Sequence, residues 1–403
     1  MLTTHLTPCR LEELGVVCAL GQGPKALRDG LLAPRADSVR PREGWRATGP
    51  TWLATVDDEL PAIPDDLLEF RSRNNALALA ALQPLLTRTE DLRCRLKPER
   101  IGVVIGTTTS GVEEATEAIG GFDAQGSMPR SFRYSQLEHG SPARFIATIA
   151  GARGPCYVIS TACSSSAKAL ASARSLLQLG LCDAVIAGGV DALTRLTVRG
   201  FSALEAVAPD RTNPFSRNRR GLNLGEAAAL FFVTRETGGI QLIGVGESTD
   251  AHHMSAPLPD GAGAERAMTL ALDDAGIRPS DVAYLNLHGT GTHLNDSSEA
   301  QAVSRAFGRI PCSSTKPRLG HTLGAAGALE LAACWALLAT HSAGNELRLP
   351  PHDFDGEYDA QLPWLDLVEP GRVIRPSGRV ILGSTSFGFG GSNCALLVEA
   401  QEA

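Results

Sequence analysis

The chain has 403 residues, which is enough for two domains or for one large unit with two lobes. Its 37 lysine and arginine residues against 44 aspartate and glutamate residues give a net charge of −7, and the basic residues are scattered. This charge argues against a nucleic-acid-binding protein. No apolar run approaches the roughly 18 residues of a membrane span, and the N-terminus lacks a basic region followed by an apolar run. We therefore expect a cytoplasmic protein with no membrane span and no nucleic-acid partner.

Nine cysteines lie between Cys9 and Cys394, and no two of them form a CxxC pair. An odd number without paired spacing predicts neither a disulfide framework nor a zinc ribbon. His252, His253 and His293 also lack the partners that would complete a ligand set, so structural or solvated roles are expected for them. We predict no metal, and buried thiols for most of the cysteines.

Strands, turns and helices alternate through the first half of the chain. Residues 101–106 form a predicted buried strand, followed by a threonine-rich turn and a helix near 112–119. A second strand, 156–160, enters a helix at 164–179, and a third strand begins at Ala184. Strands that alternate with helices predict an α/β fold.

The second half repeats this order. A strand that begins at Val282 is again followed by glycine and threonine, a helix at 323–338 follows a glycine-rich turn, and a last strand covers 380–387. Self-similarity of this kind indicates an internal duplication. The join is placed at a Thr-Gly-Gly sequence, which gives halves of 1–238 and 239–403 that are expected to pack as one body.

Cys163 is the sharpest local feature, because it stands between a buried strand and a helix that opens with serines. A thiol at a helix N-terminus faces unpaired N–H groups and the positive end of the helix dipole, which lower its pKa. This position predicts a nucleophile. From the position of Cys163 alone, a small buried apolar thiol is the alternative.

Two histidines lie at comparable junctions. His288 follows a strand directly, at the end where open α/β sheets bind ligands, and His321 lies in a glycine-rich turn before a helix. Each alone could be structural, but together with Cys163 they predict one site. A third glycine cluster, 384–393, could supply amides for an oxyanion hole or could form only a tight chain reversal.

Several motifs are specific. They are Thr161-Ala-Cys-Ser-Ser-Ser, Asn223-Leu-Gly-Glu-Ala, Ser248-Thr-Asp-Ala-His-His-Met, His288-Gly-Thr-Gly-Thr, Lys316-Pro-Arg-Leu-Gly-His-Thr-Leu-Gly-Ala-Ala-Gly and Ser386-Phe-Gly-Phe-Gly-Gly. From about Leu67 to Val398 the chain resembles the β-ketoacyl-acyl-carrier-protein synthases, the elongating condensing enzymes of the thiolase fold. The resemblance implies two βαβαβαββ halves in a five-layer α-β-α-β-α arrangement. It places the nucleophilic cysteine in the half 1–238 and both catalytic histidines in the half 239–403.

The resemblance also implies a decarboxylative Claisen condensation, in which an acyl group on Cys163 reacts with malonyl-carrier protein and no cofactor takes part. Catalytic roles are implied for Cys163, His288 and His321, for Lys316 as the support of His321, and for Phe387 as the gate of the acyl channel and an oxyanion-hole amide. Substrate-binding roles are implied for Thr290, Thr292 and Glu330. The runner-up hypothesis is a cysteine thioesterase or hydrolase. A non-catalytic chain-length partner subunit and a thiolase are further alternatives.

Partners are also implied by the resemblance. They are an acyl carrier protein and a two-fold partner subunit that contacts residues 156–160 and 132–140. The second subunit could be identical or could be a homologue that lacks the cysteine. The family often has a basic residue at the position of Glu205, so carrier docking is expected to differ here. Candidate docking residues are Arg71, Arg73, Arg130 and Arg133.

The segment 133–139 is largely apolar in elongating fatty-acid synthases, but here it reads Arg-Tyr-Ser-Gln-Leu-Glu-His. Burying Gln136 or Glu138 against a saturated tail would leave polar groups unpaired. This favours a polar or conjugated acyl chain bound at these two residues, as in an aryl-polyene or polyketide-type pathway. The alternative is that these side chains turn outward, to solvent or to a subunit interface.

Overall fold

The computed structural model describes residues 7–46, 48–129, 132–341, 346–376 and 378–401. Its main sheet has the strand order β14-β12-β11-β16-β17-β10-β1-β9-β7-β5-β6. The strands of the N-terminal half are β1 (Cys9–Cys18), β5 (Ile101–Gly106), β6 (Cys156–Ile159), β7 (Ala184–Asp191) and β9 (Ala227–Thr234). Those of the C-terminal half are β10 (Gly239–Thr249), β11 (Val282–Asn286), β12 (Pro311–Ser313), β16 (Val380–Gly388) and β17 (Ser392–Gln401).

The two halves repeat each other strand for strand. The N-terminal order is β1-β9-β7-β5-β6 and the C-terminal order is β10-β17-β16-β11-β12. In each half the first two pairings are antiparallel and the next two are parallel. A short antiparallel pairing of β1 with β10, at Cys9–Leu242 and Arg10–Gln241, joins the halves. The predicted duplicated α/β fold is confirmed.

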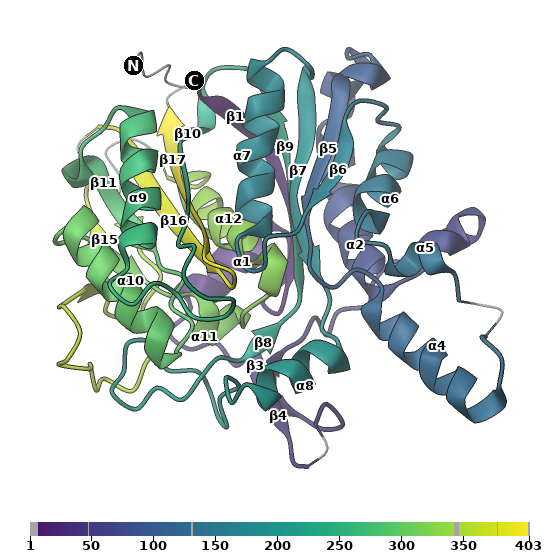
Figure 1. Ribbon diagram of the computed structural model, residues 1–403. Coiled ribbons are helices and arrows are strands. Elements are labelled where there is room, and N and C mark those ends of the chain that lie inside the picture. The colour runs from purple at the N-terminus through teal and green to yellow at the C-terminus, as the bar shows by residue number, and fades with distance from the viewer. Residues whose placement is uncertain (1–6, 47, 130–131, 342–345, 377, 402–403) are drawn as a thin grey trace.

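Helices form three layers around these strands (Figure 1). The larger helices are α1 (Gly23–Leu32), α2 (Arg73–Arg88), α4 (Val112–Gln125), α6 (Ser141–Ala150), α7 (Ser165–Gln178), α8 (Arg195–Ala203), α9 (Ala262–Ala275), α10 (His293–Ala306) and α12 (Ala326–Leu338). Helices α2 and α6 cover the N-terminal strands and α9 covers β10 and β17, with α10 packed on α9. Helices α7 and α12 contact each other and strands of both halves, so they form the central layer.

Short elements complete the chain. They are β2 (Gly21–Gln22), β3 (Val39–Arg42), β4 (Thr51–Ala54), β8 (Leu224–Gly225), β13 (Leu347–Arg348), β14 (Asp366–Leu367), β15 (Val373–Ile374), α3 (Glu90–Cys94), α5 (Tyr134–Leu137) and α11 (Lys316–Leu319). The first strand, whose sequence departs from the family pattern, is regular except for a register shift between Leu11 and Glu13. Within the described residues, no helix is both long and apolar enough to cross a membrane.

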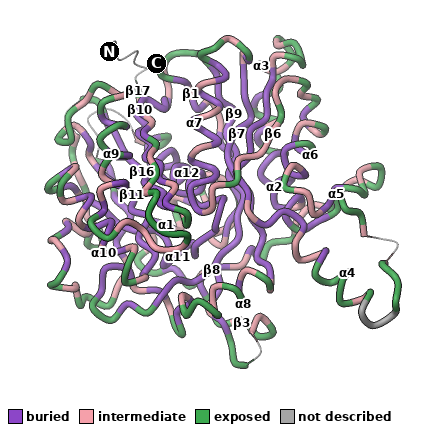
Figure 2. The backbone as a smooth tube through the Cα atoms, in the orientation of Figure 1, coloured by how far each residue is buried: buried purple, intermediate pink, exposed green. Residues whose placement is uncertain are grey.

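Burial follows the layers. Every residue of α12 is buried, as expected for a helix that is apolar on all sides apart from Glu330 and is enclosed by other elements. Figure 2 shows the same for the central strands, whereas α4 projects from the body and has exposed positions. Gly106, at the end of β5, lies where a Cβ would be 2.3 Å from the backbone nitrogen of Ser166. This close approach seats the N-terminal turn of α7 directly on the sheet edge, next to Cys163.

Candidate active site

Cys163 lies in the tight turn between β6 and α7. The preceding residue, Ala162, has a φ of +53°, a left-handed conformation that is costly for a residue with a side chain. The turn places the Cys163 thiol at the N-terminal end of α7, where it is buried. The predicted junction is therefore present.

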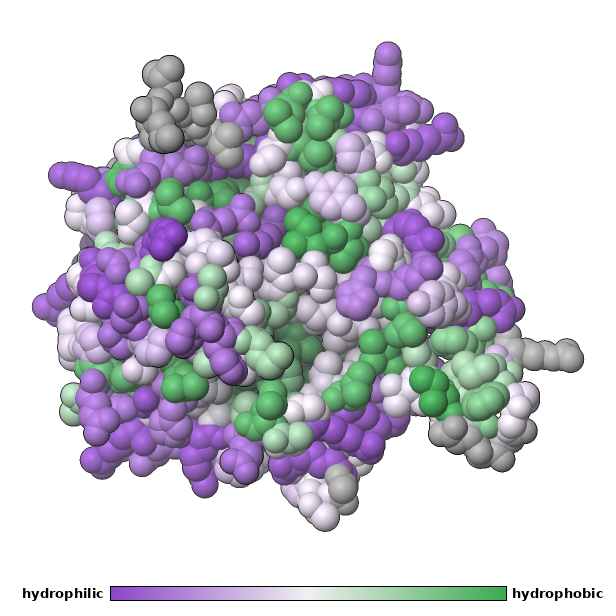
Figure 3. Space-filling view, in the orientation of Figure 1, coloured by the Kyte–Doolittle hydropathy of each residue, from purple (hydrophilic) through white to green (hydrophobic). Residues whose placement is uncertain are grey.

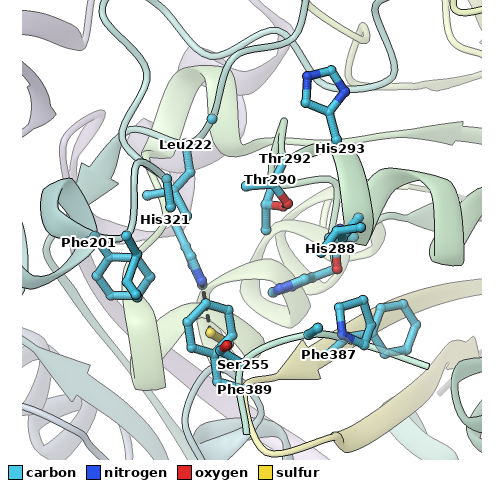
Figure 4. A pocket seen from close by; sticks show the side chains of 18 of the residues that line it. Phe201, Leu222, Ser255, His288, Thr290, Thr292, His293, His321, Phe387 and Phe389 are labelled. Atoms are coloured by element: carbon cyan, nitrogen blue, oxygen red, sulfur yellow. Dashed lines mark hydrogen bonds between the residues drawn. The ribbon is translucent and has the colours of Figure 1, made fainter. Parts of the chain in front are cut away.

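The structure brings Cys163, His321 and His288 together (Figure 4). His321 Nε2 lies 3.0 Å from Cys163 Sγ. The His288 ring meets the His321 ring edge to face, with 5.2 Å between centroids. The donor atoms of all three side chains lie within 4.8 Å of one another. Residues from β6–α7, the end of β11 and the turn after α11 thus converge, although they are up to 158 positions apart.

The backbone of His321 is held on both sides by the segment that precedes β9. The His321 N–H donates to the carbonyl of Asn223 over 2.7 Å, and the Gly225 N–H donates to the carbonyl of His321 over 3.0 Å. The side-chain carbonyl of Asn223 accepts the N–H of Thr212. The motif that begins at Asn223 therefore positions a histidine almost 100 residues further along the chain.

Lys316 supports His288, which corrects the expectation that it supports His321. Its Nζ lies 3.2 Å from His288 Nδ1, donates to the His288 carbonyl and forms a buried ion pair with Glu330. Burial, followed by the charge of Lys316, holds the pKa of His288 and of His321 well below its ordinary value. Both imidazoles are therefore neutral near pH 7.

Glu330 does not line the cavity of Cys163, contrary to the expected substrate-binding role. It lies on α12 behind Lys316, and burial raises its pKa to about 7, with Lys316 opposing that rise. The Lys316 Nζ lies between this carboxyl group and His288 Nδ1. Glu330 therefore orients Lys316, and through it His288.

The pKa of Cys163 differs from the expectation. Burial raises the pKa of this thiol to about 11, and the charge of Lys316 and a hydrogen bond from the Phe389 backbone lower it only in part. The helix N-terminus does not by itself outweigh the removal of the thiol from water. The resting thiol is therefore protonated, and His321 Nε2 is the base within hydrogen-bond distance.

The backbone amide that contacts Cys163 belongs to Phe389 rather than to Phe387. Phe387 is buried, and its ring lies 5.9 Å from that of His288. Phe389 is partly exposed, and its ring lies in front of the sulfur in the view of Figure 4. Between them, a Cβ on Gly388 would be 2.7 Å from the Thr161 carbonyl oxygen. Both phenylalanines lie in the same Phe-Gly-Phe sequence, so the sequence does not show which backbone amide contacts Cys163. The close approach of Gly388 to Thr161 brings the amide of the next residue, Phe389, to the thiol.

Two buried carboxylates that the sequence analysis missed position the catalytic loops. Glu299 accepts the backbone N–H groups of His288 and Gly289, each over 2.7 Å, and burial raises its pKa to about 7. Asp191, at the end of β7, accepts hydrogen bonds from the side chains and backbone of 107–109 and from the Gly324 N–H. Their signal in the sequence is an acidic residue in an otherwise apolar strand or helix face.

A cavity of about 470 Å³ opens above Cys163. Thr290 and Thr292 line it, as expected, with their hydroxyl oxygens 3.0 Å apart. Its other lining residues are Phe201, Leu204, Glu205, Ala206, Arg220, Gly221, Leu222, Asp250, Ser255, Ala256, Pro257, His288, His293, Leu294, Asn295, His321, Phe387, Gly388, Phe389 and Asn393. The wall combines apolar side chains with a few polar groups near the thiol, which is typical of a small-molecule site.

Gln136 and Glu138 do not line this cavity. Gln136 is buried with both ends of its amide satisfied, by the Arg71 carbonyl and the Arg133 N–H. Glu138 is partly exposed and forms an ion pair with Arg144. The argument from unpaired polar groups against a saturated tail therefore fails.

Two of the candidate docking arginines, Arg71 and Arg73, lie next to carboxylates. Arg73 donates two hydrogen bonds to the buried carboxylate of Glu226 and one to the Val56 carbonyl. Arg71 is exposed and lies 3.5 Å from Asp65. Arg133 is exposed, and Arg130 lies outside the described residues. The partner of Arg73, Glu226, lies 153 positions away, so the sequence around Arg73 does not reveal it.

Comparisons with known proteins agree with this geometry. Residues 24–238 match the family described as "Beta-ketoacyl synthase, N-terminal domain", and residues 240–347 match "Beta-ketoacyl synthase, C-terminal domain". The chain is 34% identical over 334 residues to the tetracenomycin polyketide synthase ketoacyl synthase alpha subunit of Streptomyces glaucescens, covering 76% of each chain. It is 33% identical over 326 residues to 3-oxoacyl-[acyl-carrier-protein] synthase 2 of Staphylococcus aureus (strain COL), again covering 76% of each.

Among solved structures, the chain is similar to the ketosynthase ApeO in complex with its chain length factor ApeC from Xenorhabdus doucetiae. The TM-score is 0.92 at 41% sequence identity, over 99% of this chain and 100% of that chain. The family match extends over most of the chain and includes the motifs around Cys163, His288 and His321. The chain therefore belongs to the β-ketoacyl synthases, the condensing enzymes of the thiolase-like fold.

Proposed function

We propose that the chain condenses an acyl group held on Cys163 with malonyl-acyl carrier protein, releasing carbon dioxide. The observation that carries this proposal is the 3.0 Å approach of His321 Nε2 to Cys163 Sγ, with a second neutral imidazole, His288, beside it. A nucleophile with one base suffices for acyl transfer. A second neutral imidazole is surplus to that step and fits the stabilisation of an enolate.

The first step loads the enzyme. His321 Nε2 accepts the thiol proton while Cys163 Sγ attacks the acyl thioester carbon, and the resulting oxyanion lies against the N–H groups of Cys163 and Phe389. The carbon–sulfur bond to the carrier arm then breaks, and the departing thiolate takes the proton from His321. The raised pKa of Cys163 supports this coupling, because the thiol needs a base.

The second step forms the new carbon–carbon bond. The malonyl carboxylate leaves as carbon dioxide, and its electron pair forms a thioester enolate that attacks the acyl carbon on Cys163. The bond between the acyl carbon and Cys163 Sγ then breaks, and the released thiolate takes up a proton from water. The ammonium of Lys316 next to His288 Nδ1 supports the tautomer with the proton on Nε2, which can donate to the enolate oxygen.

The deciding experiment compares two variants by intact-mass spectrometry after incubation with acyl-carrier protein. Cys163→Ala is expected to gain no acyl mass. His288→Ala is expected to load but to release no carbon dioxide from malonyl-carrier. An acylated Cys163→Ala protein would contradict the nucleophile assignment. Wild-type protein that hydrolyses acyl-carrier without decarboxylating malonyl-carrier would instead support the thioesterase alternative.

The partners of the chain are part of the same proposal. Strand β6 is the last strand of the sheet order, and its residues Cys156–Ile159 are exposed or half-buried. An unpaired strand edge of this kind favours pairing with another subunit. The second subunit is a second copy of this chain or a homologue without the cysteine. The similarity to ApeO, which was solved in complex with its chain length factor, supports the inclusion of such a homologue. Light scattering of the chain alone and with such a homologue tests this.

The proposal has three further parts. The chain is divided into the halves 1–238 and 239–403, the protein is cytoplasmic, and it acts in a secondary-metabolite pathway. All nine cysteines are free thiols, which fits a reducing compartment. The pathway now rests on similarity to ketosynthases such as that of the tetracenomycin polyketide synthase, since Gln136 and Glu138 no longer support it. Loading of Cys163 from a panel of saturated, unsaturated and aryl acyl-carriers tests it. Equal loading of long saturated chains would contradict it.

A further inference from the structure

Apolar side chains surround the mouth of the Cys163 cavity. We call Phe201, Leu204, Met254, Leu294 and Phe389 the apolar rim. Leu204, Leu294 and Met254 are 59%, 61% and 80% exposed. Four of the five line the cavity, and Met254 is tied to the same place because its carbonyl accepts the N–H of Gly390. Figure 3 shows hydrophobic atoms around a hollow near the centre of this face.

The rim is assembled from separate parts of the chain. Phe201 and Leu204 come from α8 and the residues after it, Leu294 from the first turn of α10, and Phe389 from the turn between β16 and β17. The rings of Phe201 and Phe389 lie 5.6 Å apart, so the two sides of the mouth touch. Exposed apolar patches built from several elements around a cavity are typical of binding sites.

Positive charge is scarce on the wall of this cavity. Among the described residues that line the cavity, Arg220 is the one lysine or arginine, and its NH2 group lies 2.5 Å from Asp210. Glu205 also lines the mouth, at the position where the resembled family often has a basic residue. An acidic carrier would therefore meet little favourable potential from the cavity wall.

On the surface where the family resemblance placed docking, several of the described arginines have acidic partners. Arg73 is committed to Glu226, and Arg71 lies beside Asp65. On the neighbouring α8, Arg195 forms ion pairs with Glu113 and Glu117 of α4. Arg199, also on α8, is exposed and is the remaining candidate there for an electrostatic contact.

We propose that the acyl carrier protein docks on this chain chiefly through the apolar rim, by an apolar face of its own, rather than through a basic patch. The proposal rests on the proposed function, since a carrier that delivers a thioester to Cys163 must sit over this mouth. Apolar contact at the centre of such an interface supplies most of the affinity, and surrounding charges supply mainly the association rate.

The test uses the full-length protein in the oligomeric state that it forms in solution, and it compares two acyl donors. One donor is acyl-carrier protein and the other is the same acyl group as an N-acetylcysteamine thioester, which needs the cavity but no carrier surface. The variants are Leu204→Ser with Leu294→Ser, and Leu204→Ser with Met254→Ser. The matched control is Leu179→Ser, an exposed leucine at the far end of α7 from Cys163.

The expected result for both rim variants is a fall of at least about ten-fold in the ratio of carrier-dependent to small-thioester loading, while Leu179→Ser keeps the wild-type ratio. For wild-type protein, raising the salt from 50 to 500 mM should change the KM for the carrier less than about two-fold, because apolar contacts are not screened. Circular dichroism confirms that each variant is folded.

Three results would overturn the inference. The first is an unchanged loading ratio in both rim variants. The second is a ten-fold rise of the wild-type KM for the carrier at high salt, together with a similar rise in Arg199→Glu at low salt. The third is a rim variant whose subunits dissociate in light scattering. The last would make the rim a subunit interface. In all three, Cys163 still loads and the proposed function stands. Failure of wild-type Cys163 to load from either donor would instead overturn the proposed function itself.

Discussion

The two halves of the molecule place different chemistry at equivalent strand ends. After β11 comes His288, with its backbone held by Glu299 and its ring facing the cavity. After the equivalent strand β5 come Thr107 to Thr109, which donate to the buried Asp191 and do not line the cavity. The duplication thus supplies matching positions at one edge of the sheet. At this position the C-terminal half carries a histidine that lines the cavity, and the N-terminal half carries threonines that bind a buried carboxylate.

The same contrast holds one strand further out. The turn after β6 carries Cys163, and the segment after the equivalent β12 carries Lys316 and His321. Helices α7 and α12, which follow these turns, pack against each other in the central layer. Because equivalent turns from the two halves meet there, a nucleophile from one half can contact a base from the other. The duplicated fold therefore explains why the site lies between the halves.

Removing His288 should have the largest effect. His288→Ala is expected to lower the rate of malonyl-carrier decarboxylation by about 10²–10⁴-fold, because a positioned proton donor in the transition state contributes about that much. The matched change after the equivalent strand, Thr108→Ala, is expected to lower it only a few-fold. Carbon dioxide release measures both. Similar losses in the two variants would contradict the division of roles between the halves.

Removing Asp191 should mainly destabilise the fold. Asp191→Ala leaves the donors of 107–109 and the Gly324 N–H without their buried acceptor, and we expect a loss of about 3–5 kcal/mol in the free energy of unfolding. Asp191→Asn keeps one acceptor and should lose less. Urea unfolding measures the difference. A variant as stable as wild type, but inactive, would place Asp191 in the chemistry rather than in the support.

The pH dependence should show the role of Lys316. A histidine whose pKa is lowered in the folded enzyme stays neutral below the pH at which an ordinary histidine protonates, near 6.5. From the two histidines alone, the condensation rate is therefore expected to stay nearly constant from pH 8 down through 6.5, and to fall only at lower pH. Lys316→Gln removes a charge that lowers both pKa values, so the acid loss should move to higher pH. A pH–rate profile of the two proteins checks this. An unshifted acid limb would contradict the electrostatic role.

The same histidines predict how stability depends on pH. The native state binds fewer protons than the unfolded chain at any pH where His288 is neutral in the native state and charged in the unfolded chain. Stability from this source is thus complete above about pH 6.5, the unfolded pKa, and is lost as the pH falls below it. His288→Asn should show a smaller loss of thermal stability between pH 7 and pH 5 than wild type. An equal loss would show that other groups dominate the slope.

The smallest effect is expected at the cavity wall. Thr290→Val removes one hydroxyl of a pair that lies 3.0 Å apart in the wall of the Cys163 cavity. A single neutral hydrogen bond contributes about 0.5–1.5 kcal/mol, which corresponds to roughly a two- to twelve-fold rise in KM with little change in kcat. Steady-state kinetics with malonyl-carrier measure it. A large fall in kcat would move Thr290 from binding to chemistry.

The sequence by itself determined the α/β class, the duplication and three of the side chains that meet at the candidate site. Two local features of the sequence carry this information. They are the alternation of strands and helices and the placement of Cys163, His288 and His321 at strand ends, and neither depends on how distant segments pack. Two carboxylates of the site, Asp191 and Glu299, gave too weak a local signal to be recognised, because an isolated acidic residue in an apolar element has many explanations.

Only the tertiary structure decided which groups pair. Lys316 contacts His288 instead of His321, and the amide of Phe389 instead of Phe387 contacts Cys163. Arg73 pairs with Glu226, 153 positions away. Each of these choices depends on the distance and burial created when the two halves pack on α7 and α12. The energy of a charge or a polar group depends on such surroundings far more than on its neighbours in sequence.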